Sequence, residues 1–276
     1  MKTLLFVLPL AIVIRAYGQQ DTSAPKFGWG HSAVAGLTLT QIAFTDWTQG
    51  GENSLAWTTS LEGKSTDDEP TINWVNTYKF AFGQARLGDQ GLRKTDDKID
   101  LASVLTYKLG NLINPYFAAT LMTQFTRGYK YESSGNSISV SNFFDPGYLR
   151  QSVGVGYQPM PEVKTRLGVA LREIVTSEFT AIYAKDAATR VAGGLESVTE
   201  VNWNLAENIL FTSKLELFDP FKKLDQVIMR NDNTLALKVN KYITTVLNVQ
   251  LVNEAPVSPR TQVKEVIAIG LSYTLL

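Results

Sequence analysis

The chain has 276 residues, in which 26 lysines and arginines balance 26 aspartates and glutamates. This balance gives no support for a nucleic-acid partner or a polybasic membrane anchor. There is one histidine and no cysteine, which excludes a disulfide framework, a thiolate metal site, a cysteine nucleophile and a multi-histidine metal site. We therefore expect neither a cofactor nor a bound metal.

The first 18 residues have the pattern of a cleaved secretory signal peptide. Lys2 is positively charged, the run from Leu4 to Ile14 is apolar, and small residues precede the expected cut after Gly18. The apolar run is too short for a membrane-spanning helix, which needs about 20 residues. We expect an exported protein in which residues 19–30 form a periplasmic lead-in and residues 31–276 form one domain.

From residue 31 onward, apolar and polar side chains alternate with the period of β-strands. In residues 209–218, for example, Phe211 and Leu215 would face one side of a sheet while Lys214 and Glu216 face the other. Most segments of this kind have about 10 residues or more, which is enough to cross a bilayer at a tilt, whereas strands of soluble proteins mostly have about 5 or 6. The pattern predicts twelve strands, over residues 32–44, 54–62, 71–85, 97–109, 115–126, 150–158, 163–173, 193–203, 208–218, 228–240, 242–252 and 262–275.

The connections between these segments alternate in length. Short ones, such as Asn240-Lys241, follow the even-numbered strands, and most of those after the odd-numbered strands are longer. This organisation is typical of an up-and-down outer-membrane barrel, with turns in the periplasm and loops outside the cell. We therefore predict an all-β protein, a transmembrane antiparallel barrel of about 12 strands in the outer membrane of a Gram-negative bacterium.

The C-terminal strand supports the same location. Its pattern Gly270-x-x-Tyr273-x-Leu275 is similar to the terminal-strand signal that the barrel assembly machinery reads. The expected partners are therefore outer-membrane lipid and that machinery, with a further envelope protein as a possible partner. A secreted soluble β-barrel or β-sandwich that binds a ligand is the alternative fold, but it leaves the long strands and alternating connections unexplained.

If the apolar side of each strand faces lipid, the alternate residues line the lumen. Gly154, Gly156, Gly168 and Ala170 would leave room there for a small solute, whereas a network of ion pairs would fill a narrow lumen. Since both signs of charge occur, a pathway through the lumen would have no strong ion selectivity. The predicted lumen-lining charges are Lys164, Arg166, Arg172, Glu196, Glu200, Lys214 and Glu216.

An outer-membrane lipid hydrolase is the alternative function. Acyl hydrolysis of this type needs a serine activated by a histidine, and the only imidazole is His31, at the start of the first strand. That position lies at the periplasmic rim, where we expect a solvated side chain. We therefore predict no catalytic residue and no enzymatic activity.

The acidic stretch RKTDDKID offers a second group of candidate side chains. We expect Asp96, Asp97 and Asp100 to be solvated on a loop that enters a strand and to be neutralised by neighbouring basic residues. A calcium site would need more oxygen ligands than this stretch clearly offers.

Two of the predicted loops could hold a binding site. The stretch FTDWTQGGENSLAW, residues 44–57, would connect the first two strands outside the cell. Its candidate binding residues are Asp46, Trp47, Gly50, Gly51 and Asn53, although two adjacent glycines also suit a simple turn. The longer loop, residues 127–149, is rich in Tyr, Phe and Ser, and could form a raised hairpin, a partner surface or a lid.

Four stretches of the first half resemble a known family: GWGHSAVAGLTLTQIAFTDWTQGGENSLAW, INWVNTYKFAFG, LRKTDDKIDLASVLTYKLG and TLMTQFTRGY. Together they look like the uncharacterised domain of unknown function 3078 family of Bacteroidota-type outer membranes. The resemblance implies an outer-membrane barrel and supplies no activity. The family's characteristic positions hold Trp47, Gly50, Gly51, Asn53, Lys94 and Asp97, with Asp46 where Asn is more usual.

The sequence thus predicts a small-solute pore or transport protein, porin-like in architecture, or a structural subunit of an envelope complex.

Overall fold

The protein is a closed antiparallel barrel of twelve strands, which confirms the predicted fold class. The computed structural model describes residues 27–43, 52–110, 112–132, 135–185, 187–222, 226–240, 242–255 and 257–275. Among these residues, no helix combines the length and the apolar character that a membrane crossing requires. The predicted signal peptide and most of the predicted lead-in lie outside the described residues.

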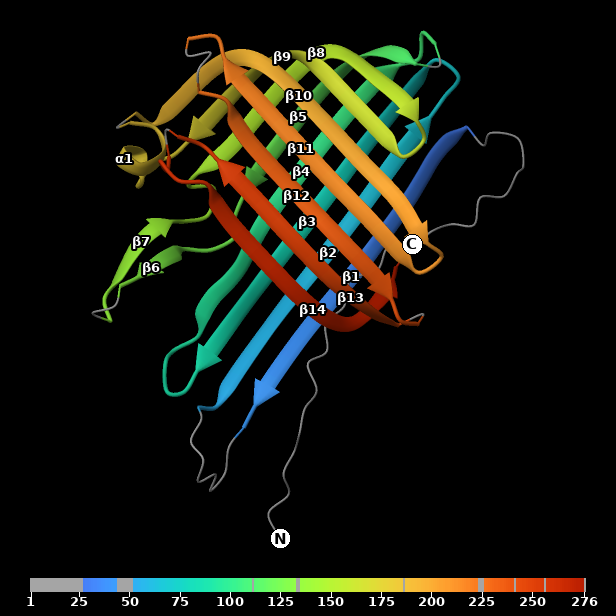
Figure 1. Cartoon of the computed structure of the whole chain (residues 1–276). Helices are drawn as coiled ribbons and strands as arrows, with labels where there is room; N and C mark the ends of the chain where they lie inside the picture. Colours follow the sequence, from blue (N-terminus) through green and yellow to red (C-terminus); the bar gives the residue numbers. More distant parts are fainter. Residues whose placement is uncertain are drawn as a thin grey trace.

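Each barrel strand pairs with its neighbours in sequence, apart from the closing pair and one pair that flanks a small hairpin (Figure 1). That hairpin consists of β6 (Gly128–Tyr131) and β7 (Ser137–Ser141), and a short helix α1 (Thr180–Tyr183) lies in a later connection. The barrel strands are β1 (Gly28–Ile42), β2 (Ser54–Asp68), β3 (Ile72–Leu87), β4 (Arg93–Tyr107), β5 (Ile113–Thr123), β8 (Gly147–Met160), β9 (Val163–Val175), β10 (Thr189–Ala206), β11 (Ile209–Pro220), β12 (Ile228–Lys238), β13 (Ile243–Asn253) and β14 (Gln262–Thr274).

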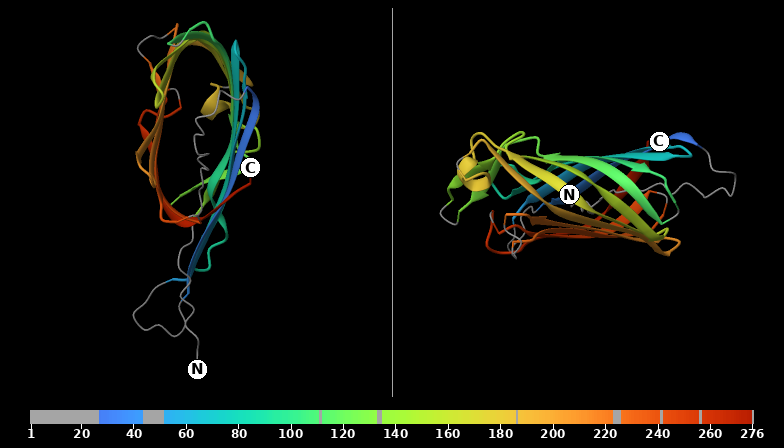
Figure 2. Two further views of the ribbon diagram at one scale, coloured as in Figure 1. Left: turned by 90° about the vertical axis from the view of Figure 1, so that its right-hand side faces the viewer. Right: turned by 90° about the horizontal axis from the view of Figure 1, so that it is seen from above.

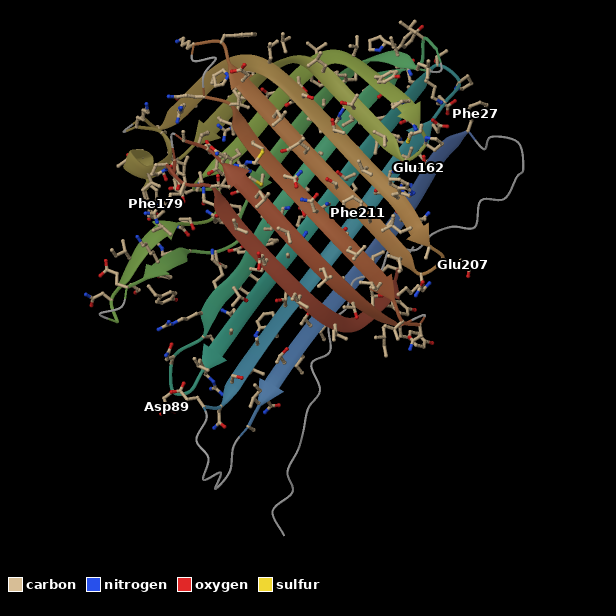
Figure 3. All side chains as sticks on the ribbon, viewed as in Figure 1. Phe27, Asp89, Glu162, Phe179, Glu207 and Phe211 are labelled. Atoms are coloured by element: carbon tan, nitrogen blue, oxygen red, sulfur yellow. The ribbon has the colours of Figure 1, made fainter. Side chains whose placement is uncertain are left out.

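The two ends of the barrel differ in their connections, as the sequence predicted. We call the end with the β2–β3, β4–β5, β8–β9, β10–β11 and β12–β13 connections the turn end, and the opposite end the loop end. Figure 3 shows Phe27, Glu162 and Glu207 at the turn end and Asp89 and Phe179 at the loop end. Both ends of the described chain lie at the turn end.

Several boundaries differ from those expected, and β2, for example, ends at Asp68 and not at residue 62. β1 begins at Gly28 and therefore takes in the last residues of the predicted lead-in, residues 19–30. The β3–β4 connection comprises only residues 88–92, because the two strands continue to pair as far as Ala85 and Arg93. The expected long loop at this position is therefore wrong: its polar residues belong to the strands.

The outward face of the wall is apolar. Large apolar side chains are exposed along it, including Leu167, Val191 and Ile267. Exposed aromatic side chains mark its turn end, where Trp29 contacts Trp74 edge-on at 5.6 Å between ring centroids. At the loop end, Trp57 and Phe82 are 5.6 Å apart, and Phe80 and Phe125 are 6.2 Å apart. These pairs form two aromatic belts at the ends of the apolar face.

The barrel has a flattened cross-section, as seen along its axis in the left view of Figure 2. Around β8, β9 and β10 the wall bends sharply, and glycines on its inner side permit the bend. The Tyr116 side chain reaches Gly168 with its hydroxyl group, and an added Cβ there would sit 2.8 Å from the hydroxyl oxygen. In the same way, the ring of Phe218 covers Gly194. Aromatic cover over a strand glycine stabilises such a bend.

The wall closes between β1 and β14 through an unusually short ladder. Only Val34 to Leu37 of β1 pair with β14, although β1 pairs with β2 along its whole length from Gly28 to Ile42. On its other side, β14 pairs with β13 from Gln262 to Leu271. We call this four-residue ladder the seam.

Candidate functional site

The candidate site is the loop half of the lumen, where charged side chains meet from opposite walls. Two groups are present. The central group contains Arg150, Glu196, Lys214 and Glu216, and the loop-side group contains Tyr148, Arg172, Arg230 and Glu254.

In the central group, one arginine holds two acids. The Arg150 guanidinium on β8 contacts Glu196 on β10 and Glu216 on β11, each at 2.8 Å. Lys214 adds a second cation to Glu216 at 2.7 Å. Because the acid side chains are shielded from solvent, each depends on these cations for its stability. The group therefore ties together three strands of the barrel.

The loop-side group crosses the lumen. Arg172 on β9 donates two hydrogen bonds to Glu254, at 2.8 and 2.9 Å, and Glu254 follows β13 in the chain. Arg230 on β12 approaches the same carboxylate at 3.5 Å. Its guanidinium also lies 5.0 Å from the centroid of the Tyr148 ring and 3.3 Å from the Met122 sulfur on β5. Since β11, β10, β9 and β8 separate β12 from β5, Arg230 bridges the barrel.

A second bridge lies nearer the seam. Lys264 on β14 donates to the Asp96 carboxylate on β4 at 2.8 Å, across β1, β2 and β3. On β4 itself, Lys98 pairs with Asp100 at 3.1 Å. The side chains of opposite walls therefore narrow the lumen in its loop half.

A small cavity remains between these side chains. Its volume is about 140 Å³, enough for a few water molecules at about 30 Å³ each. Its charged lining residues are Lys98, Asp100, Arg150, Arg172, Lys214, Glu216, Arg230 and Asp232. With Glu196 and Glu254 beside it, five cations face five anions, so the surroundings of the cavity have no net charge.

Some of the predicted lumen-lining residues belong to this site, and the others lie in the half of the lumen nearer the turn end. Arg172, Glu196, Lys214 and Glu216 belong to the two groups. Arg166 pairs with Glu200 at 3.3 Å closer to the turn end, and Lys164 is exposed near the β8–β9 turn.

Sequence reasoning missed three important members of the site. Arg150 and Arg230 have the inward parity of their strands, which is a usable signal. Glu254 belongs to a connection, where alternation says nothing about direction, and only the folded loop brings it to the arginines.

The glycines expected to leave room in the lumen do not do so. A Cβ on Gly154 would collide with the Leu167 carbonyl oxygen, and one on Gly168 with the Val153 carbonyl oxygen. Ala170 is buried. These small residues serve the sharp bend of the wall, and only Gly156 has ordinary contacts at the position of an added Cβ.

The acidic stretch at the start of β4 is also not solvated as expected. Asp97 is buried and accepts hydrogen bonds from the backbone amides of Phe125 and Thr126, at 2.6 and 2.9 Å. Lys94 pairs with Asp97 at 2.9 Å and donates to the Thr126 carbonyl at the same distance. Lys94 and Asp97 therefore hold the chain where it leaves β5, and Asp96 and Asp100 are paired in the lumen. No cluster of three or more His, Cys, Asp or Glu in the described residues could hold a metal ion.

Two connections fold together as a cap at the loop end, defined as residues 124–132, 135–146, 176–185 and 187–188. At its centre, the Asp145 carboxylate accepts hydrogen bonds from the hydroxyl of Thr176, the hydroxyl and amide of Ser177, and the amide of Glu178. Tyr183 in α1 donates to the Val140 carbonyl at 3.0 Å. Seen along the barrel, α1 lies within the outline of the wall (Figure 2, left).

The electrostatics of Asp145 follow from these contacts. Burial by itself raises the pKa of the carboxyl, because the charged form loses water. The hydrogen bonds from Glu178, Thr176 and Ser177 outweigh burial, and the pKa therefore lies below its ordinary value of 3.8. The ionised Asp145 carboxylate thus joins the two connections through hydrogen bonds.

His31 lies on the outward face at the turn end. Its Nδ1 is 2.9 Å from the Ser65 hydroxyl, and its ring stacks on Trp29 at 5.7 Å between centroids. Ser65 is 34 residues away, and no sequence pattern indicated the pair. The Ser65 backbone lies in a regular ladder opposite His31, which offers no obvious pair of free amides for an oxyanion.

Of the candidate loop site, only one residue is described. Asn53 lines a surface hollow of about 520 Å³ together with Arg86, Asp89 and Leu92. Asp46, Trp47, Gly50 and Gly51 lie outside the described residues. The other long loop contains the β6–β7 hairpin, with positive φ at Gly135 in its turn.

Three barrels are among the solved structures that the chain resembles at low similarity. The translocator domain of the autotransporter NalP from Neisseria meningitidis has 10% identity and a TM-score of 0.39, with 92% of this chain and 90% of that chain covered. The β domain of the Bordetella autotransporter BrkA has 12% identity and a TM-score of 0.34, with 90% and 97% covered. The monoaromatic hydrocarbon channel CymD has 6% identity and a TM-score of 0.35, with 91% and 88% covered.

No curated protein matches the chain. Residues 39–129 match the model of a family described as a protein of unknown function (DUF3078). These residues run from β1 into β6 and include Lys94 and Asp97, which fix the exit from β5. The match confirms the resemblance to an uncharacterised family over this part of the chain.

Proposed function

We propose that the protein is an outer-membrane barrel that lets small polar solutes cross along its lumen. The observation that carries the proposal is the charged cavity of about 140 Å³ between opposite walls. The interior of an outer-membrane barrel is polar whether it is open or filled, so the unfilled space between the charged side chains, and not the charge itself, supports a pathway. Here charged side chains surround a space that can hold water.

The outward face supports a place in the membrane. Its exposed apolar side chains and two aromatic belts suit a bilayer. Every barrel strand has 11 residues or more, the length that crosses a bilayer at a tilt. We assign the barrel to the outer membrane of a Gram-negative bacterium, of the Bacteroidota type that the family resemblance implies.

The character of the pathway follows from its charges. Equal numbers of cations and anions surround the cavity, so neither sign of solute is strongly favoured. The bridges by Arg230 and Lys264 keep the passage narrow. We expect slow passage of small neutral or zwitterionic solutes and a small single-channel conductance.

A liposome-swelling assay on refolded protein tests this function. Arg230→Ala removes the bridge to Tyr148 and Met122 but leaves Glu254 paired with Arg172, so it should widen the passage without isolating a buried carboxylate. We expect faster swelling with small sugars and a larger conductance in planar bilayers. Leu235→Ala, on the outward side of the same strand, is the control and should behave as the native protein. No swelling by either the native protein or Arg230→Ala would refute a lumen pathway.

A role as a structural subunit of an envelope complex is the second candidate, favoured by the β6–β7 hairpin. Tyr129, Tyr131 and Ile138 are exposed there, and exposed aromatic groups are common in partner surfaces. Co-purification of stoichiometric partners from native membranes, lost when residues 129–138 are replaced by a short polar turn, would support it. An enzymatic role forms no part of the proposal, because the Ser65–His31 pair has no evident oxyanion site.

A further inference from the structure

The seam leaves part of the barrel wall unpaired. Continuing its register would set Thr38 opposite Gly270 and Leu39 opposite Ile269, but pairing stops at Leu37 and Leu271. Both strands remain paired on their other sides over this length. Figure 1 shows β1 and β14 running apart from the seam toward the loop end. The edges of Thr38–Ile42 and Val266–Gly270 therefore face an interruption in the wall.

Such an interruption matters in a membrane. An unpaired backbone group in hydrocarbon costs several kcal/mol, which is why spanning barrels normally close completely. Here the two edges have compatible register and no proline between Gln262 and Gly270, so nothing in the sequence forbids pairing. The opening therefore lies between two edges that have the register to pair and do not.

The side chains around the opening define what could pass. On the outward side, Leu39, Ile267 and Ile269 are exposed, Ile267 to 79%, and Gln41 is the polar side chain among them. The residues of inward parity are small or apolar on both edges: Thr38 and Thr40 on β1, and Val266, Ala268 and Gly270 on β14. A narrow space with such a lining suits an alkyl chain better than an ion.

Charge is kept away from this space. Lys264 is the inward cation nearest to it along β14, and its ammonium group is drawn across the lumen to Asp96 at 2.8 Å. Beyond it lie the polar side chains of the cavity. A molecule in the opening would therefore meet an apolar rim first and a polar interior second.

We propose that the unpaired part of the seam is a lateral opening through which a slender alkyl-bearing molecule moves between the lumen and the outer leaflet. The inference rests on the proposed function in placing the barrel in the outer membrane. It assigns a different route and a different class of solute from the axial passage of polar molecules.

A fluorescent label tests whether alkyl chains reach the inner side of the wall. Ala268→Cys carries a bimane label on β14. Ala236→Cys carries it in the same row of the sheet, on a strand paired on both sides. The chain has no cysteine of its own. With phospholipids brominated on their acyl chains, the label at 268 should lose most of its fluorescence while that at 236 keeps it. Bromodecane in ordinary bilayers tests a free alkyl solute.

A pair of engineered disulfides tests the opening by closing it. Ala35→Cys with Tyr273→Cys joins residues already paired and should oxidise readily. Leu39→Cys with Ile269→Cys joins residues that face each other only after further pairing, and should oxidise slowly. In cells expressing the barrel, the second disulfide should abolish the extra entry of an apolar dye, and a reductant should restore it. The first should leave dye entry unchanged.

The outcomes separate the proposals. If the labels at 268 and 236 are equally protected, a strand of another chain fills the seam or β1 and β14 pair fully, and the lateral opening is refuted. The same conclusion follows if the 39–269 disulfide forms as fast as the control, or forms without affecting dye entry. Swelling by small sugars reports the axial lumen and should persist with this disulfide, so either route can fail without the other.

Discussion

Single glycines decide how tightly this barrel can bend. At Gly168, hydrogen is the only side chain that leaves space for both the Val153 carbonyl and the Tyr116 hydroxyl. At Gly156, on the neighbouring strand, an added Cβ would have its nearest contact at 3.5 Å, with the Asn114 carbonyl oxygen. Residues of the same type and inward parity therefore have different tasks, which local sequence alone does not distinguish.

This difference gives a prediction at the residue scale. Gly168→Ala should destabilise the folded barrel by about 1–3 kcal/mol, because the methyl group forces backbone and Tyr116 to shift. Gly156→Ala is the matched control and should change stability by less than about 0.5 kcal/mol. Urea unfolding in detergent micelles, followed by tryptophan fluorescence, measures both. Equal midpoints for the two variants would contradict the tight contact.

At the scale of elements, the cap joins two connections that are distant in sequence. Asp145 receives donors from residues 176–178, and Arg127 contacts Glu178 at 2.8 Å. Gln124 donates to the carbonyls of Asn142 and Asp145. The first connection is thereby folded on itself and attached to the second, which positions α1 at the loop-end mouth.

Asp145→Asn tests the attachment. The neutral amide offers one acceptor oxygen in place of two, so some of the four donors lose their partner, at about 1–3 kcal/mol for a buried donor. We expect faster hydrogen exchange in residues 176–183 and no change in the barrel strands. Asp89→Asn, in the exposed β3–β4 connection, should leave that exchange unchanged. Unaltered exchange in Asp145→Asn would show that other contacts hold the cap.

Acid should have the same effect on the native cap. Because the folded pKa of Asp145 lies below the ordinary 3.8, its stabilisation is fully present above the unfolded pKa and disappears as the pH falls through the folded pKa. The protection factors of residues 176–183, in which the intrinsic pH dependence of amide exchange is removed, should therefore fall in strong acid and stay constant between pH 5 and 7, values on the order of one unit or more above the unfolded pKa. In Asp145→Asn this acid step should be missing.

At the scale of the molecule, the barrel combines a long hydrogen-bonded wall with charged side chains that connect distant strands across the lumen. The wall resists unfolding because its strands are paired on both sides except at the seam. The contacts of Arg150, Arg172 and Arg230 join parts of the wall that are not neighbours. Stability should therefore be largely kinetic.

Gel electrophoresis tests this expectation. Unboiled protein in dodecyl sulfate should remain folded and migrate differently from boiled protein. Arg150→Met should need less heating for conversion, because Glu196 loses its cation, a change worth about 3–5 kcal/mol for a buried pair. Lys238→Met, at the turn end of β12, is the control. A native protein that shows no shift on boiling would contradict a barrel of this stability.

Sequence alone located the twelve barrel strands closely, because alternating apolar and polar faces repeat in every one of them. It also indicated the lumen parity of Arg172 and Glu216. It could not reveal the bend at Gly168, since that depends on Tyr116 reaching across from β5. The sequence could not show that Glu254 enters the lumen either, because the path of a connection depends on the whole fold. The seam depends on the closing register of the barrel, which no single strand encodes.

The short seam also bears on how the chain becomes a barrel. Nearly all ladders join strands adjacent in sequence, so the sheet can grow hairpin by hairpin with low loop-closure entropy. The β1–β14 ladder alone must bring the two ends of the sheet together, and it gains only four residue pairs for doing so. Closure is therefore the step that adds the fewest backbone hydrogen bonds to the growing sheet. We therefore expect closure to be the last step of folding. Until the rest of the wall is complete, the edge of β14 is free to pair with another strand.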